Sequence, residues 1–264
     1  MILAVLAEGN SIASTARITG ADDEAILRLL KDIAVVCRAT HDTRIRKLTC
    51  RVIEADELWS FVYKKEKRTT PVDKAHRRGD AWLWLATDID TKLIVSYLVA
   101  DRTLVSATSF MRDLASRLTH RVQLNSDGLL AYVDSVESAF GSDVDFVQAG
   151  AIMNGSPDMD CAVTSHVERL NLTIRMHDRR FTRKTNAFSK RIENHAASVD
   201  FHVLYYNFIR VHMSLSVTPA MEAGIADHIW TYEELVELLE QRERDALDSP
   251  LAKFRRLRER AGSG

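Results

Sequence analysis

The stretch AWLWLATDIDTKLIVSYLVA, residues 81–100, contains two apolar runs separated by a short polar turn. The second run is rich in β-branched residues, which pack well in a pleated strand. The turn DIDTK between the runs predicts that they pair as a β-hairpin. A third strand is predicted just before this hairpin, in RVIEADELWSF, residues 51–61.

Helices and strands are predicted to alternate after the hairpin. The apolar spacing predicts a helix over 104–118, a strand over 121–127, a helix over 128–140 and a strand over 143–148. After a loop, the rest of the chain is predicted to be helical. Three strands followed by alternating helices and strands describe an α/β fold with a mixed sheet flanked by helices. By analogy this order matches the ribonuclease-H-like architecture, which alone does not define a function.

The N-terminal segment, residues 1–40, is predicted to form short helices around a turn. Asn10 or Ser11 can cap one helix, and Gly20 can end it. A further helix is predicted to follow, so the segment has the order of a small helix-turn-helix, a common DNA-binding unit. That helix opens with the acidic residues 22–24, and acids that face phosphate weaken DNA binding.

The composition is that of an ordinary globular protein, with 46% hydrophobic and 28% charged residues among 264. No apolar run approaches the roughly 20 residues that a membrane-spanning helix needs. The three cysteines, Cys37, Cys50 and Cys161, show neither a zinc spacing nor a disulfide framework. We therefore expect a cytoplasmic protein without a membrane partner.

Basic residues gather in three segments, 64–78, 168–193 and 253–260, although the formal net charge is only −1. Local basic patches on a nearly neutral protein indicate a polyanion site. The alternative is that each patch is simply a solvated face.

Two aspartates are predicted to meet at one edge of the sheet. Asp127 ends a predicted strand, at the sheet edge where ligands usually bind. Asp56 lies inside an apolar strand, where an acid is costly to bury unless it is paired or binds a cation. If the two strands are neighbours, the carboxylates repel unless a cation lies between them. Glu168 on a later helix would complete a three-carboxylate site suited to Mg²⁺ or Mn²⁺, and two such ions can cleave a phosphodiester.

Each carboxylate also has a purely structural interpretation. Asp127 precedes a glycine and can cap a helix, and Glu168 can be an ordinary surface residue. Asp56 can pair with Arg77 or Arg78. Other residues stay open as ligands or helpers of the site, namely Glu54, Glu57, His166 and the pair Asp88 and Asp90 in the hairpin turn.

The chain resembles the DDE transposases of bacterial insertion sequences of the insertion-sequence-one type. The resemblance is carried by DELWSF, GDAWLWLATDIDTKLIVSYLV, NSDGLLAY, TSHVERLNLTIRMHDRRFTRKTNAFSK and YYNFIRVHMSLSVTPAMEAGI. It implies a helix-turn-helix segment over 1–40, shortened at its first helix, a ribonuclease-H-like catalytic domain over 50–225, and a helical tail over 226–264.

The resemblance also implies an activity and its residues. Asp56, Asp127 and Glu168 would form the catalytic triad and bind two Mg²⁺ or Mn²⁺ ions. The enzyme would cleave the element ends and join the 3′-hydroxyl to target DNA, as a nucleoid-associated homodimer or higher oligomer. The partners would be double-stranded terminal inverted repeats and target DNA. The implied DNA-binding residues are Arg169, Asn171, Arg175, Arg179, Arg180, Arg183, Lys184 and Lys190.

Two other functions fit the same sequence. The segment before residue 164 is shorter than this family usually has, which favours a catalytically decayed copy or a non-catalytic DNA-binding protein. A ribonuclease-H-like nuclease of another kind is the third alternative.

Overall fold

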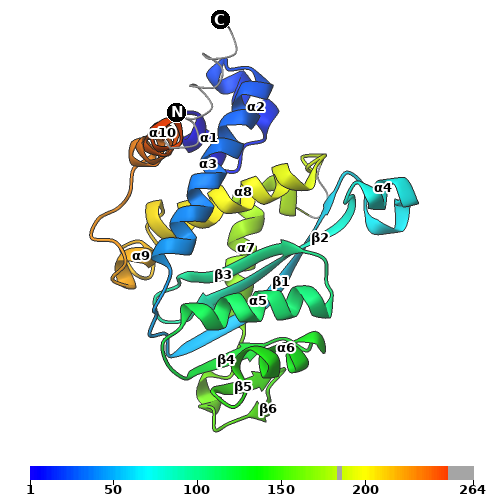
Figure 1. The fold of residues 1–264 in the computed structure, drawn as a ribbon, viewed down its shortest axis with the longest axis vertical. Coiled ribbons are helices and arrows are strands. Elements are labelled where there is room, and N and C mark those ends of the chain that lie inside the picture. The colour runs from blue at the N-terminus through cyan, green and yellow to red at the C-terminus, as the bar shows by residue number, and fades with distance from the viewer. Residues whose placement is uncertain (183–185, 249–264) are drawn as a thin grey trace, which may run out of the picture.

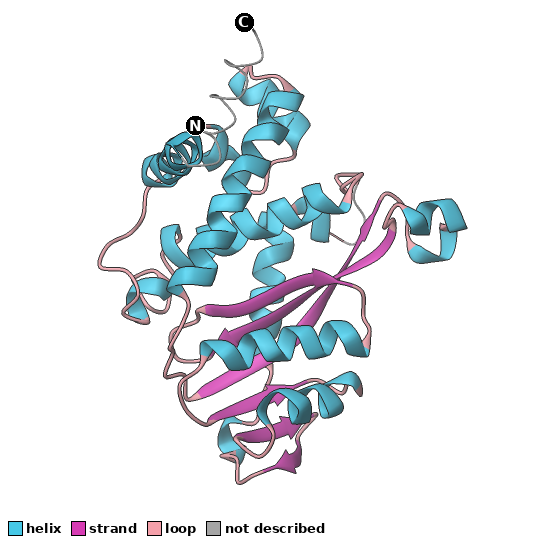
Figure 2. Cartoon of the chain, in the orientation of Figure 1, coloured by secondary structure: helices cyan, strands magenta, loops and turns pink. Residues whose placement is uncertain are grey.

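A six-stranded mixed sheet lies at the centre of the computed structural model, which describes residues 1–182 and 186–248 (Figures 1 and 2). The spatial order is β3-β2-β1-β4-β5-β6, with parallel pairing of β1 with β4 and of β4 with β5. The other neighbours are antiparallel, so the predicted mixed sheet and its hairpin are confirmed. The strands are β1 (Val52–Val62), β2 (Gly79–Asp88), β3 (Ile94–Ala100), β4 (Val122–Ser126), β5 (Val144–Gln148) and β6 (Ala151–Asn154).

Helices cover both faces of this sheet, and the arrangement is compatible with a ribonuclease-H-like fold. Side-chain alternation along β1 divides the core, because successive residues of a strand point to opposite faces. Ala55 packs in the cluster that contains α5 and α6, whereas Leu58 packs with Leu170 of α7 and Val199 of α8. These helices are α5 (Leu104–Arg117), α6 (Ala131–Phe140), α7 (Ser165–His177) and α8 (Ile192–Leu204).

Three helices at the N-terminus precede the sheet: α1 (Ile2–Ala7), α2 (Ile12–Thr19) and α3 (Asp23–Arg44). The Ser11 side chain accepts a hydrogen bond from the Ser14 amide and caps α2, and Gly20 ends that helix at φ 73°. The predicted capping residue and the predicted terminating glycine of this helix are both confirmed. The use of α2 and α3 as a DNA-binding helix-turn-helix stays a prediction.

Helix α3 is longer than its sequence pattern predicted. Residues 41–44, which lie beyond the helical segment predicted over 1–40, form its last turn, because His41 is buried and α3 packs along α8. The Arg117 guanidinium also donates to the Ile45 carbonyl at 3.1 Å, just beyond the helix end. Tertiary packing therefore overrides the polar composition of this turn.

Two further boundaries differ from the predictions. Residues 151–154, expected in a loop, form β6, because Ala149 and Gly150 adopt φ of 46° and 80° and close a two-residue hairpin. Alanine is a rare residue at such a turn, so no local pattern predicts this hairpin. Helix α6 begins at residue 131 rather than 128.

The described residues after α8, up to residue 248, form further helices, as predicted. Trp230 and Leu235 belong to the same core cluster as Ile26 of α3, so the tail packs on the N-terminal helices. No helix in the described ranges is long and apolar enough to cross a membrane. The remaining elements here are η4 (Tyr205–Ile209, a π-helix), α9 (Pro219–Glu222) and α10 (Tyr232–Asp248).

Candidate active site

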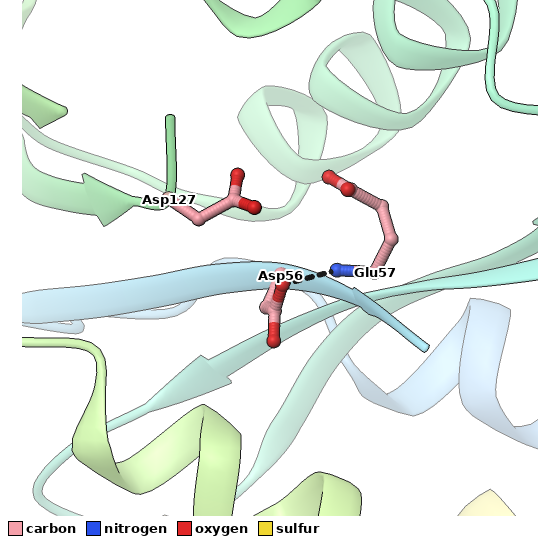
Figure 3. Close-up of side chains that lie close together, drawn as sticks. All are labelled: Asp56, Glu57 and Asp127. Carbon is pink, nitrogen blue, oxygen red and sulfur yellow. Dashed lines mark hydrogen bonds between the residues drawn. The ribbon is translucent and has the colours of Figure 1, made fainter. Parts of the chain in front are cut away.

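Three carboxylates meet where β1 and β4 lie side by side. Oxygen atoms of Asp56, Glu57 and Asp127 all lie within 4.8 Å of one another (Figure 3). The β1–β4 ladder ends with Ala55 opposite Ser126, so the next residues, Asp56 and Asp127, leave it as neighbours. The prediction that these two strands are adjacent is confirmed, and the register explains why the two aspartates meet.

Asp56 is oriented by two hydrogen bonds. Its Oδ1 accepts from the Glu57 amide at 2.8 Å, and its Oδ2 accepts from Asn171 Nδ2 of α7 at 2.6 Å. The alternative partners do not bind it, since Arg78 donates to Asp73. Burial raises the pKa of Asp56 to about 6, and the nearby charges of Asp127 and Glu168 act in the same direction.

Glu57 is the member of the group that the sequence left open. Its Oε2 accepts from Arg102 Nε at 3.1 Å and from Nη2 at 3.0 Å, and its side chain is only 1% exposed. Burial raises the pKa of Glu57 to about 7, although Arg102 opposes the shift. Arg102 Nη2 also lies 3.8 Å from Asp127 Oδ2, so one guanidinium serves two carboxylates. No spacing rule predicts Arg102, which follows β3 on a separate segment.

Asp127 is the most accessible of the three, with a side chain 39% exposed. Its Oδ1 accepts from the Leu129 amide at 3.1 Å and fixes the turn after β4. The N-cap of α6 is Leu130, so the interpretation of Asp127 as a helix cap is wrong. The other oxygen faces Arg102 and is open to a further ligand.

Glu168 lies in the first turn of α7 and is exposed. Its Oε1 accepts from Thr164 Oγ1 at 3.0 Å, and among described residues it is outside the close three-carboxylate group. Its charge nevertheless raises the pKa of Asp56. The structure thus brings Asp56 and Asp127 together and places Glu168 beside them on another element.

Glu54 fixes the start of α7. This fully buried carboxylate accepts from the backbone amides of His166 and Val167, each at 2.8 Å, and contacts His166 Nδ1 at the same distance. Thr164, the N-cap residue, makes no capping bond, so Glu54 satisfies the free amides of the helix. Because Glu54 and Asp56 are two apart on β1, they share a face, a signal present in the sequence.

The segment before α7 is also tied to the sheet. Asn125 Nδ2 of β4 donates to the carbonyls of Cys161 at 2.6 Å and of Val163 at 3.1 Å. Gln123 exchanges hydrogen bonds with the backbone of Asp158. The short segment that precedes α7 therefore lets the helix dock on β1.

The residues predicted to bind DNA differ in their accessibility. Arg169, Arg179 and Lys190 are exposed, and Arg175 is half-buried. Asn171 is buried against Asp56, and Arg180, 13% exposed, binds Asp178 and Ser198. Both would have to leave these partners to reach DNA, and all six roles stay predictions. Arg183 and Lys184 lie outside the described residues.

Asp88 and Asp90, the other acidic pair considered as metal ligands, are accounted for by the hairpin turn. Asp88 accepts from the amide and hydroxyl of Thr91, the latter at 2.6 Å, and Asp90 pairs with Arg51 at 3.2 Å. These bonds are those of a tight turn, and no other described carboxylate, histidine or cysteine converges with this pair into a metal-binding group.

The three-carboxylate group fits a hard divalent cation. All donors are oxygen atoms, the type that Mg²⁺ and Mn²⁺ prefer. Glu57 Oε1 is buried, and the Tyr132 hydroxyl is the one hydrogen-bond donor offered to it among the described residues. Burial raises the pKa of Asp56 and of Glu57, with the charge of Asp127 acting in the same direction, and a bound cation would favour the ionised forms.

Comparison with known proteins points to mobile DNA elements. No protein-family model matches the sequence. The chain is similar to the InsB protein of insertion element iso-IS1n from Shigella dysenteriae, with 29% identity over 164 residues. The match covers 61% of this chain and 96% of that protein. This distant similarity relates the chain to an insertion-element protein.

Proposed function

We propose that this chain is a DNA transposase of an insertion sequence, which cleaves element ends and joins the 3′-hydroxyl to target DNA. The observation that carries the proposal is the convergence of Asp56 and Asp127 from β1 and β4. Other ribonuclease-H-like nucleases would need similar carboxylates. The similarity to an insertion-element protein favours a transposase among them.

In this proposal Asp56, Asp127 and Glu168 hold two Mg²⁺ or Mn²⁺ ions. Bound ions of this kind activate a water or hydroxyl nucleophile and stabilise the leaving oxygen of a phosphodiester. Asn171 keeps the Asp56 carboxylate turned toward α7, and Glu54 holds α7 against β1, which sets the distance from Glu168 to the aspartates. Arg102 balances the charge of Glu57 and holds this side chain on the face of the sheet opposite α7.

The proposed partners are double-stranded terminal inverted repeats and target DNA. Two element ends must be held together during transposition, so the active complex would be at least a homodimer. The proposed phosphate contacts are the exposed cations of this region, namely Arg169 within α7 and Arg179 and Lys190 in the stretch that follows it.

One observation favours the alternative of a decayed or non-catalytic DNA-binding copy. Asp22 caps α3, and Asp23 and Glu24 are exposed in its first turn. These acids stabilise the helix start but repel phosphate, so α3 is poorly suited to read DNA with that end.

A transposition assay in cells tests the proposal. A donor plasmid would carry a selectable marker between the terminal repeats of the element, and marker transfer would be counted. Asp56→Asn, Asp127→Asn and Glu168→Gln should each lower the frequency more than about 100-fold, because direct ligands matter at least as much as the groups behind them. Asp90→Asn, in the hairpin turn, is the matched control and should keep it. Unchanged transfer by Asp127→Asn would contradict the metal mechanism, and no transfer by the parent would favour the decayed copy.

A further inference from the structure

A folded basic arm extends beyond the end of the β1–β2 hairpin. The arm, residues 63–78, contains η1 (Glu66–Arg68) and α4 (Pro71–Ala75), and Figure 1 shows it projecting from the body of the protein. Residues 64–78 hold seven basic and two acidic side chains, a formal charge of +5, whereas the whole chain carries −1. The remainder is therefore at −6, so the positive charge is concentrated on this projection.

The arm is held in one conformation by a buried acid. Asp73 accepts from Lys64 Nζ at 2.8 Å, from Arg78 Nη1 at 3.2 Å, and from both the amide and hydroxyl of Thr70. Lys74 pairs with Glu66 at 2.8 Å. These bonds engage three of the seven cations and make the arm a preformed scaffold.

Four cations on the arm are left for another partner. Lys65, Lys67, Arg68 and Arg77 are exposed, and none forms an ion pair with another described residue. Lys65 Nζ lies 5.3 Å from the centre of the Trp59 ring, but no acid neutralises its charge or those of the other three among the described residues. Like charges on a compact scaffold repel one another. Their arrangement suits a ligand with several negative charges along its length.

The arm is continuous with the carboxylate site. Val62, at the base of the arm, lies six positions after Asp56 along β1, a span of roughly 20 Å at about 3.3 Å per residue. Tyr63 donates its amide to the Ser189 carbonyl at 2.8 Å, so the base of the arm adjoins the exposed Lys190. Duplex DNA rises about 3.4 Å per base pair, so this span equals about six base pairs.

We infer that the basic arm binds the phosphate backbone of double-stranded DNA, starting about six base pairs from the phosphate held at the carboxylates and extending away from it. The inference rests on the proposed function, because it takes the DNA to occupy the carboxylate site. The contact is independent of base sequence, since the free groups are cations on long side chains. A second copy of the chain, through its acidic α10, is the competing occupant.

The test compares two variants with equal loss of charge. The arm variant is Lys65→Gln, Lys67→Gln, Arg68→Gln and Arg77→Gln. The matched control is Lys47→Gln, Arg112→Gln, Arg242→Gln and Arg244→Gln, all exposed positions outside the arm. Lys47 has φ 56° and matches Arg77 at 54°, so backbone strain is balanced. Binding to a labelled 40-base-pair duplex of one element end would be followed by anisotropy in EDTA over a range of salt concentrations.

The arm variant should bind at least about 100-fold more weakly at 0.1 M salt. Its slope of log affinity against log salt should fall by about 3 to 4, because each phosphate contact contributes about 0.9. Lys67→Gln with Arg68→Gln should lose about half of that slope, and the control should lose less than about 1. Hydroxyl-radical protection should disappear about six base pairs from the cleaved phosphate.

Each contrary result has a distinct meaning. An unchanged slope in the arm variant, or an equal loss in the control, overturns the inference while the proposed function stands. Loss of self-association in sedimentation, with DNA binding intact, assigns the arm to a second copy and also overturns it. Failure of the unmodified protein to bind the duplex overturns both the inference and the proposed function.

Discussion

The acidic run on β1 divides its residues between the two faces of the sheet. Glu54 and Asp56 point toward α7, where one caps the helix and the other accepts from Asn171. Glu57 points to the opposite side, where Arg102 binds it (Figure 3). One strand thereby supports a helix, presents a candidate ligand and anchors a balancing cation.

Loss of the Glu54 carboxylate should destabilise the protein. In Glu54→Gln the amide nitrogen would face the donors on His166 and Val167, so at least one buried hydrogen bond is lost, at about 1–3 kcal/mol. Urea unfolding followed by circular dichroism would measure this change. Glu168→Gln, exposed on the same helix, is the control and should alter stability by less than about 0.5 kcal/mol. Equal stability of the Glu54 variant and the parent would refute the capping role.

The raised pKa values predict that Mg²⁺ stabilises the protein more at high pH. The folded-state pKa values of Asp56 and Glu57, about 6 and about 7, exceed their ordinary 3.8 and 4.5. Between about pH 4 and pH 7 the folded state therefore retains protons that the unfolded chain has lost. The stability of the metal-free protein falls as the pH rises through this range. At pH 8 both groups are ionised and a cation relieves their repulsion, whereas at pH 5.5 protons compete with it.

Thermal unfolding with and without 10 mM MgCl₂ would measure this effect. The rise in Tm should be larger at pH 8 than at pH 5.5, and Asp127→Asn should lose most of it. An equal rise at both pH values, or an equal rise in the variant, would mean that Mg²⁺ binds elsewhere.

The sequence was informative about single residues where strand geometry fixes them. Asp56 and Asp127 were predicted to meet because adjacent parallel strands present their ends at one edge. Arg102 and the amide of Asn171 were not predicted as partners, since their positions depend on how a loop after β3 and a separate helix pack. Arg180 shows the same limit, because its partner Ser198 lies on another helix.

Among the secondary-structure elements, α3 and α5 are joined by one buried guanidinium. Arg117, 1% exposed, pairs with Asp113 on its own helix and with Asp42 of α3, each at 2.7 Å. It also donates to the Ile45 carbonyl. A buried cation with this many acceptors fixes the angle between the N-terminal helices and the sheet.

Arg117→Met should therefore be destabilising. The substitution keeps an apolar stem but removes the donor that Asp42, Asp113 and the Ile45 carbonyl share. The two carboxylates are partly exposed, so the cost is about 1–3 kcal/mol. Denaturant unfolding measures it. The exposed Arg112 on the same helix donates to Ser138, and Arg112→Met should cost less than about 1 kcal/mol. A similar cost for the two variants would contradict the joining role.

Element order was predicted more accurately than element ends. Hydrophobic periodicity predicted the five strands up to residue 148 and the two helices α5 and α6, but not the short α4 between β1 and β2. It missed β6, whose turn contains an alanine at φ 46°, and the last turn of α3, which packing stabilises. Both misses concern interactions between segments, which local pattern does not contain.

In the whole molecule, the packed hydrophobic core and the concentrated positive charge lie in different parts of the chain. One hydrophobic cluster joins the N-terminal helices, one side of the sheet and α10, so these parts support one another. The positive charge instead gathers on the basic arm, next to the stretch that follows α7. In our account the packed body positions the carboxylates and the arm holds the DNA.

We propose that Asp56 and Asp127 direct metal-dependent cleavage at an element end. Strand cleavage of an end-labelled duplex of that end by purified protein with Mg²⁺, resolved on a denaturing gel, tests this proposal. We expect a nick that leaves a 3′-hydroxyl at the element end and that is absent in EDTA and in Asp127→Asn. Cleavage by Asp127→Asn at the parent rate, or binding without cleavage by the parent, would contradict it.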